Sequence, residues 1–487
     1  MGNLSLLLAL PLAGAALIAL LPVERTRLIR RVAMIAAGAA LILAWALALG
    51  FDTSLAGIQY AESIRWNPRL GTTYALGVDG VSLPLVMLAT LLALVAILAS
   101  RYVADRPKGY YLLMLVLESA MLGVFMAQDW ALFYVFWELT LIPLFFLIDR
   151  WGGKGRAGAS LNFVLYTLGG SVFMLISLLL LFDAVPGHSF AMADMGRGAP
   201  ALPEETQILI FLGLLIGFGV KMPIFPIHGW LPLAHVEAPS PVSILLSGIL
   251  LKMGSYGLLR AVVLLPDAAQ ALQGVLLGIA LISLVYGGLL AWRQTDLKAM
   301  IAYSSISHMG VVLVGIAALN VAGLTGALTQ MVAHGLVAGA LFLLIGLLYE
   351  RTHTRDIGHY SSLIRVTPRF AFFTILAFVA AVGMPGTAGF IAELHALIGG
   401  FARWGWLMVL LSVGVLISAA YAVRTIGRLF TGPVRPQMRH VTDLRGSEMW
   451  AASVLTGGIL VLGVFPAPAL RLSQATLAAL SAGFGGL

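Results

Sequence analysis

Long apolar runs fill this chain of 487 residues and constrain its fold more than any other feature. Sixty per cent of the residues are hydrophobic and only 10% are Asp, Glu, Lys or Arg, against about 25% charged in an ordinary soluble domain. So few charges cannot cover a water-exposed surface. The composition therefore excludes a soluble enzyme, a disordered chain and a DNA-binding domain. It predicts an all-α polytopic membrane protein.

The apolar runs are long enough to cross a bilayer, whose core of about 30 Å needs roughly 20 residues per helix. The first run has no basic region before it, so we expect a membrane span rather than a cleaved signal peptide. The sequence predicts about 14 spans, at 2–21, 32–50, 81–100, 110–127, 130–148, 160–182, 206–234, 240–264, 271–290, 299–318, 322–348, 370–400, 404–423 and 449–467.

Positive charge alternates between the loops that join these spans. Of the 29 Lys and Arg residues, 21 fall in alternate loops, six in the opposite loops and the C-terminal tail, and two within spans. Loops rich in Lys and Arg stay on the cytoplasmic side. The pattern predicts that both termini face the periplasm. It also explains the net charge of +8 without nucleic acid as a partner.

Two over-long spans carry a Met-Pro pair at matching points, at Met222-Pro223 in the seventh and Met384-Pro385 in the twelfth. Proline removes a backbone donor and clashes with the preceding turn, so each helix should break there. Paired breaks in two halves indicate a transport site, although Pro and Gly are also common in membrane helices generally. Because the breaks are five helices apart, the sequence predicts two inverted five-helix repeats.

The predicted organisation follows from this spacing. An N-terminal three-helix segment (1–108) precedes the first repeat (109–265) and the second repeat (266–430). A C-terminal helix and tail (431–487) complete the chain.

Charged side chains inside the spans are the main functional candidates, because each costs on the order of 2.5–3.5 kcal/mol on insertion scales. Lys221 lies at the first break and Lys252 lies mid-span, too far from either end to snorkel easily. Glu138 is the natural counter-ion for Lys221. Glu393 is the matching acid just after the second break.

Histidines inside the spans add groups that titrate near physiological pH. His308 and His334 are candidates for a proton relay or for hydrogen-bonded core histidines, and His228 either caps the first broken helix or opens a path to water. Glu118 is a relay candidate or a partner for another polar group. Lys298 is expected at the membrane interface, with a role in proton uptake as the alternative.

Several chemistries are excluded by what the sequence lacks. It contains no cysteine, which rules out disulfides, thiolate catalysis and cysteine-ligated iron–sulfur clusters. It has neither a dinucleotide-binding fingerprint nor a P-loop. Its His and carboxylate residues lack metal-ligand spacing, so no metal is predicted. Any redox chemistry must lie on another chain.

Three motifs carry a resemblance to a known family: FYVFWELTLIP at 133–143, KMPxxPxHxWLP at 221–232 and YSSISHMG at 303–310. Together they resemble the antiporter-like membrane subunits of respiratory complex I over nearly the whole chain. The GVDG stretch at 77–80 and Glu393, where sister subunits typically carry Lys, indicate a branch within that family. The segment 235–241, with charged residues and a second Pro, departs from the plainer loop expected there.

The resemblance implies one proton channel. Glu138 and Lys221 would form the ion pair of its first half, Lys252 the central relay, His334 the link into the second half and Glu393 the exit. His308 and His228 would be secondary members.

It also implies where the chain works. FMN, iron–sulfur clusters and quinone would lie on partner subunits, and sister antiporter-like subunits would flank the chain in the bacterial inner membrane. Electron transfer from NADH to quinone would drive proton translocation.

Two other functions remain open at this point. A subunit of a cation/proton antiporter, or of a ferredoxin- or hydrogenase-linked pump, would use the same buried charges. A purely structural scaffold would tolerate their neutralisation.

Overall fold

The computed structural model describes residues 2–67 and 71–484, and helices form most of them. The N-terminal part contains α1 (Asn3–Leu20), α2 (Thr26–Leu49), strands β1 (Gln59–Asn67) and β2 (Thr72–Val78), α3 (Ser82–Ala99) and the short η1 (Ser100–Tyr102).

The first predicted repeat contains α4 (Pro107–Met126), α5 (Trp130–Leu139), α6 (Leu141–Trp151), α7 (Arg156–Ala184), α8 (Met192–Gly198), η2 (Ala199–Ala201), α9 (Glu204–Lys221), α10 (Trp230–Glu237), α11 (Ser240–Leu245), the π-helical turn η3 (Leu246–Leu250) and α12 (Leu251–Leu264).

The second contains α13 (Pro266–Ala271), α14 (Gln273–Arg293), α15 (Leu297–Ala317), α16 (Val321–Thr352), η4 (Ile357–His359), α17 (Leu363–Val366), α18 (Pro368–Ala381), α19 (Ala388–Trp404), η5 (Gly405–Met408) and α20 (Val409–Phe430). After η6 (Pro436–Met438), α21 (Ser447–Val464) and α22 (Ala467–Ala482) complete the described chain.

The protein is an all-α membrane protein in its architecture. Twelve helical stretches of the described residues are long and apolar enough to cross a membrane. One of them, Ala388–Phe430, contains two helices, α19 and α20, separated at Gly405. The charged helix α9 and the 14-residue α18 are not among the twelve. The predicted total of 14 spans stays a prediction, as do the four segment boundaries.

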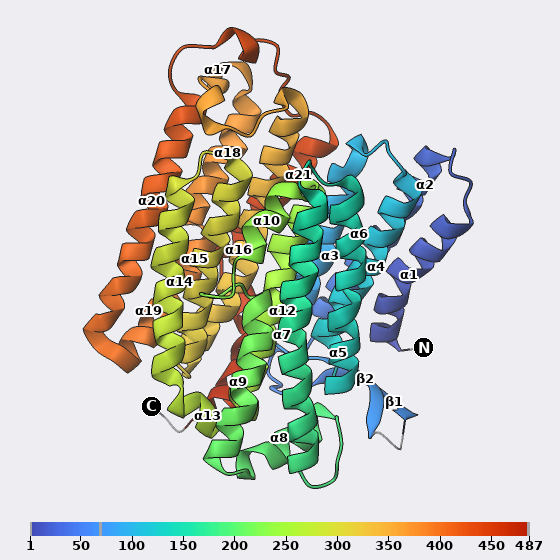
Figure 1. The fold of residues 1–487 in the computed structure, drawn as a ribbon, viewed down its shortest axis with the longest axis vertical. Helices are drawn as coiled ribbons and strands as arrows, with labels where there is room; N and C mark the ends of the chain where they lie inside the picture. Colours follow the sequence, from blue (N-terminus) through green and yellow to red (C-terminus); the bar gives the residue numbers. More distant parts are fainter. Residues whose placement is uncertain (1, 68–70, 485–487) are drawn as a thin grey trace.

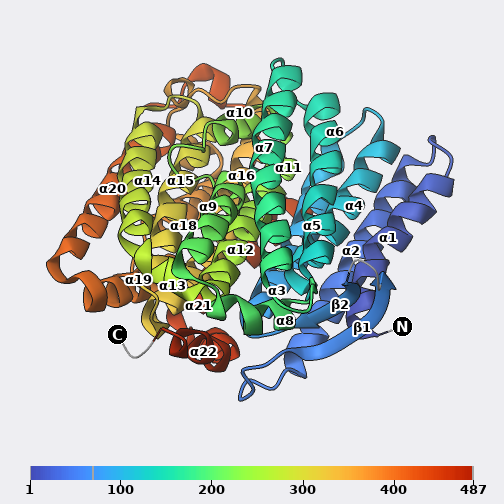
Figure 2. The ribbon, with the colours of Figure 1, turned by 60° about the horizontal axis from the view of Figure 1, so that its bottom comes forward.

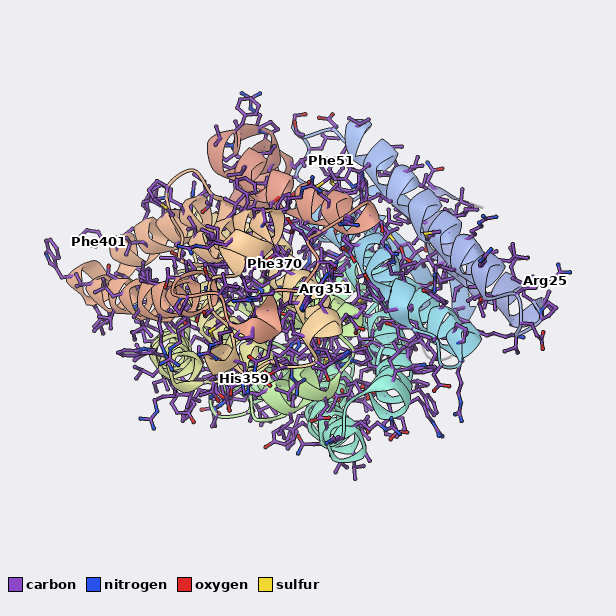
Figure 3. All side chains as sticks on the ribbon, turned by 90° about the horizontal axis from the view of Figure 1, so that it is seen from above. Arg25, Phe51, Arg351, His359, Phe370 and Phe401 are labelled. Carbon is purple, nitrogen blue, oxygen red and sulfur yellow. The ribbon has the colours of Figure 1, made fainter. Side chains whose placement is uncertain are left out.

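The helices stand side by side, with α1 and α2 at one edge and α20 at the other (Figure 1). Viewed from above, Arg25 lies at one margin and Phe401 at the opposite one (Figure 3). The described termini lie at the end that also carries β1, β2 and α22 (Figure 2). We name this the termini end. The Arg-rich loops lie at the other, which we name the basic end.

Both predicted breaks are present and share one backbone pattern. After α9, the N–H groups of residues 222, 224 and 227 donate to the carbonyls of 218, 219 and 224. After α18, the N–H groups of residues 382, 384 and 387 donate to those of 378, 379 and 384. Each pair differs by 160 residues, whereas the two Met-Pro pairs differ by 162, so this pattern places Pro223 opposite Gly383 rather than opposite Pro385.

A second match lies at two helix starts. Asp129 accepts the N–H groups of Ala131 and Leu132, and Asp296 accepts those of Lys298 and Ala299. Each aspartate also forms an isolated antiparallel bridge, to residues 191 and 356 respectively. These N-caps satisfy backbone donors that a helix start leaves free. The inverted symmetry itself stays a prediction.

Four features were not predicted. Strands β1 and β2 form an antiparallel hairpin, and α22 follows the last span at the termini end (Figure 2). The fifth span is interrupted at Thr140 between α5 and α6, three residues before Pro143, which has no N–H to donate. The eighth contains the π-helical turn η3. Such turns recur at functional sites.

Candidate functional site

The centre of the site joins the two halves of the molecule. The Lys252 Nζ atom on α12 lies 2.6 Å from Nδ1 of His334 on α16 and donates to the Ser247 carbonyl at 2.6 Å. All three residues are buried. Ser247 belongs to η3, so the unpredicted wide turn supplies an acceptor for the buried lysine. The Lys252–His334 contact is short enough for direct proton transfer.

Lys221, the last residue of α9, is buried beside the interruption of the fifth span. Its Nζ atom donates to the Trp137 carbonyl and to Thr140 Oγ1, both at 3.1 Å, and lies 3.9 Å from the Trp137 ring centroid. A cation over an indole face gains electrostatic energy. The interruption therefore forms a cradle of two oxygens and one ring for the ammonium group.

Glu138 does not contact Lys221 directly, contrary to the predicted ion pair. Among the described residues, Glu138 and Lys221 do not form an ion pair with an N···O distance of 4.0 Å or less. The Glu138 Oε1 atom is buried without a hydrogen-bond partner, and the residue as a whole is partly exposed. Glu138 precedes Leu139 and Thr140, so its side chain leaves the helix in a different direction from Thr140. Its charge acts on Lys221 through space.

Aromatic rings pack on the termini-end side of Lys221. Trp137 stacks on Phe133, at 5.6 Å between centroids, and both rings meet Phe218 edge-on. Trp130 extends this group by contacts with Phe133 and Phe218. The four rings form one aromatic cluster, and its Trp137 ring is the one that contacts Lys221.

The second half brings His308, His334 and Glu393 around one small cavity. The two imidazole rings meet edge-on at 5.2 Å between centroids, and His308 Nε2 lies 3.0 Å from the Ala381 carbonyl at the end of α18. Gln330 also lines this cavity, in which the centre of a water molecule can occupy a volume of about 10 Å³. Glu393 is partly exposed. The three residues predicted for the second half-channel therefore line one cavity.

Gly383, in the break between α18 and α19, sets the position of Glu393. Its φ is +74°, a conformation that favours glycine. A Cβ atom at this position would collide with the Glu393 carboxylate. The carboxylate thus lies directly against the backbone of the broken helix.

Lys298, predicted at the membrane interface, is the second residue of α15 and is buried within the protein. It is 3% exposed, and its Nζ atom donates to the Ala238 carbonyl at 2.6 Å. It lines a cavity of about 320 Å³ at the basic end, together with Tyr102, Glu237 and Arg355. Lys298 is thus the buried lysine that adjoins this cavity.

His235, which we did not predict as a site residue, is fully buried, and both its ring nitrogens lack hydrogen-bond partners. It stacks on Phe342 at 4.7 Å between centroids. The segment that departs from the family pattern also contains Glu237, whose carboxylate accepts the Gly155 N–H at 2.8 Å. Nothing in their spacing distinguished these residues in the sequence.

Two further candidates lie apart from these contacts. Glu118 on α4 is fully buried, and neither of its carboxylate oxygens has a hydrogen-bond partner. His228, in the first break, packs against Phe225 and Tyr286. Its Nδ1 atom is buried without a partner. The structure joins neither residue to the Lys252–His334 contact.

The described residues contain no group of three or more His, Cys, Asp or Glu side chains that could hold a metal ion. The Lys252–His334 contact and the cavity beside it bring together nitrogen and oxygen atoms that can bind protons. A lysine, two histidines and a glutamate follow one another across the buried core.

Comparison with known proteins decides the family. The model of the NADH:quinone oxidoreductase/Mrp antiporter transmembrane family matches residues 127–418. The chain belongs to this family. NADH-quinone oxidoreductase subunit M of Rhodobacter capsulatus is 39% identical over 95% of this chain and 93% of its own length. NAD(P)H-quinone oxidoreductase chain 4 2 of Thermosynechococcus vestitus is 39% identical over 98% and 91%. The predicted resemblance is confirmed.

Two solved structures show the same fold. A chain of respiratory complex I from Thermus thermophilus with bound NADH matches with a TM-score of 0.91 at 34% identity, over 99% of this chain and 100% of that one. A chain of the Mrp complex from Dietzia sp. DQ12-45-1b matches with a TM-score of 0.88 at 22% identity, over 99% of each. The latter likeness concerns the fold alone.

Proposed function

We propose that this chain is a proton-translocating membrane subunit of an NADH–quinone oxidoreductase, acting as part of a translocase. FMN, iron–sulfur clusters and quinone lie on partner subunits in this proposal, and sister antiporter-like subunits flank the chain. It resides in a bacterial cytoplasmic membrane. The basic end faces the cytoplasm and both termini face the periplasm, in accordance with the positive-inside rule.

The observation that carries the proposal is the Lys252–His334 contact of 2.6 Å. A lysine and an imidazole buried together are costly to keep in a membrane protein unless they serve transport. Each can hold or release a proton, and the two come from opposite halves of the molecule. The high similarity to quinone oxidoreductase subunits M and 4 supports the same function.

The relay runs in the order Glu138, Lys221, Lys252, His334 and Glu393. A redox event on partner subunits changes the charge near Glu138, and Lys221 in its cradle responds through space. Protons reach Lys252 from the cavity at the basic end. His334 accepts a proton at Nδ1 and passes one on toward His308 and Glu393.

Lysine substitution tests the relay. The complex containing Lys252→Met, reconstituted in vesicles, should oxidise NADH with less than about a tenth of the wild-type proton uptake, because methionine cannot bind a proton. Lys154→Met is the matched control, since Lys154 is exposed in the loop before α7. Normal proton uptake per electron by the Lys252 variant would overturn the proposal.

A cation/proton antiporter subunit is the second candidate, favoured by the family match, because the description of that family includes the Mrp antiporter. This function requires Na⁺ or K⁺ exchange for protons in vesicles without NADH. The identity of the copurifying proteins in mild detergent discriminates between the two. Flavin- and iron–sulfur-containing partners support the oxidoreductase, whereas ion exchange without them supports the antiporter.

A further inference from the structure

The cavity between the histidines and Glu393 contains a polar group to which the relay assigns no role. Gln330 on α16 is 3% exposed, and its Oε1 atom is buried without a hydrogen-bond partner. Burying a carbonyl of this kind without a partner destabilises the fold. The unpaired Gln330 Oε1 atom and its position on the cavity wall both require an explanation.

The geometry of α16 directs Gln330 toward the proton path. Gln330 and His334 are four residues apart and therefore lie on one helix face, about one turn from each other. His334 uses Nδ1 for Lys252, which leaves Nε2 for the other side of the ring. His334 lines the cavity together with Gln330, His308 and Glu393.

The cavity has the size and the polarity to bind one water molecule. Its space for a water centre is about 10 Å³, close to the minimum of roughly 10–15 Å³ that a buried water occupies. A buried water also needs two to four polar partners. An imidazole, a carboxylate and an amide oxygen meet this requirement.

We propose that Gln330 is a positioning residue that holds a bridging water between His334 and Glu393. This inference rests on the proposed proton-translocating function. The water accepts the Nε2–H proton of His334 and gives one of its own protons to the Glu393 carboxylate. Its remaining O–H group donates to Gln330 Oε1, and His334 regains a proton at Nδ1 from Lys252. The net change is the transfer of one proton from Lys252 to Glu393. His334 ends with its proton on Nδ1 instead of Nε2, and the water and Gln330 are unchanged.

Two variants disturb the water in different ways. Gln330→Met keeps the length of the side chain but removes the acceptor. Ala333→Val keeps Gln330 but fills the cavity that Ala333 also lines. Thr329→Val is the control on the same helix, because the Thr329 hydroxyl donates to the Thr325 carbonyl within the helix and does not line the cavity.

The experiment uses the intact complex in vesicles, with NADH oxidation and proton uptake measured together in H₂O and in D₂O. We expect Gln330→Met and Ala333→Val to slow proton uptake at least about tenfold and to raise its solvent isotope effect, with the KM for quinone unchanged. Thr329→Val should match the wild type. A merely structural role for Gln330 would not change the isotope effect.

A second measurement does not depend on the variants. A high-resolution electron-microscopy map of the wild-type complex should show one water within hydrogen-bond distance of Gln330 and Glu393. Either an empty cavity in such a map or wild-type rates in both cavity variants would overturn the inference. Lys252→Met, assayed in parallel, separates the failures. If it blocks uptake while the cavity variants do not, only the role of Gln330 is lost, and if it pumps normally the proposed function fails.

Discussion

The Lys252–His334 contact gives the sharpest prediction. Replacing His334 with Leu removes the acceptor at 2.6 Å and leaves Lys252 with the Ser247 carbonyl alone. A hydrogen bond to a charged group contributes about 1.5–3 kcal/mol. Each 1.36 kcal/mol is a factor of ten in rate, so proton uptake should fall between about 10-fold and about 150-fold.

The assay is NADH-driven proton uptake by the intact complex in vesicles, normalised to the amount of assembled subunit. His440→Leu is the matched control, because His440 is exposed in the loop before α21. Its proton uptake should equal that of the wild type. His334→Gln, which retains a hydrogen-bonding side chain, should be slowed less than His334→Leu.

A double-mutant cycle tests whether the two residues act through one contact. The variant Lys252→Met with His334→Leu should be no slower than Lys252→Met alone, because either change already removes the interaction. If the two losses instead multiply, the residues act independently. That result would refute a relay through the Lys252–His334 contact.

Three further predictions follow from single contacts. Gly383→Ala should lower NADH-driven proton uptake at least about tenfold without loss of the assembled subunit. The added Cβ atom would displace the Glu393 carboxylate, and the φ of +74° disfavours alanine. Unchanged uptake would contradict the placement of Glu393. Thr140→Val should slow uptake about tenfold by removing one acceptor from the Lys221 cradle, whereas Thr140→Ser should restore most of the rate. In the loop after α16, the hydrogen bond from the Gly358 N–H holds the pKa of Asp356 below its ordinary value. The stabilisation is therefore present above about pH 4, the ordinary pKa, and is lost as the pH falls through the lowered pKa. The protection factor of the Gly358 amide, its exchange rate relative to the intrinsic rate at the same pH, should fall there, and Asp356→Asn should remove that pH dependence.

The sequence by itself determined the features that depend on local chemistry. Apolar length placed the membrane helices, and Met-Pro pairs placed the two breaks, because a proline prevents the regular hydrogen bond wherever it occurs. The buried lysines were found in the same way, since a charge within an apolar run stands out without knowledge of its neighbours. The hairpin of β1 and β2 and the helix α22 were missed because they are short and do not cross the membrane.

Only the tertiary structure decided which of these groups meet. Lys252 and His334 are 82 residues apart, and their contact depends on how α12 packs against α16. Lys221 is held by the Trp137 carbonyl and Thr140 rather than by Glu138, because the interruption at Thr140 exposes acceptors that no sequence pattern reveals. Partners in a buried cluster are fixed by packing between distant segments, whereas spans and breaks are fixed by the residues at the position itself.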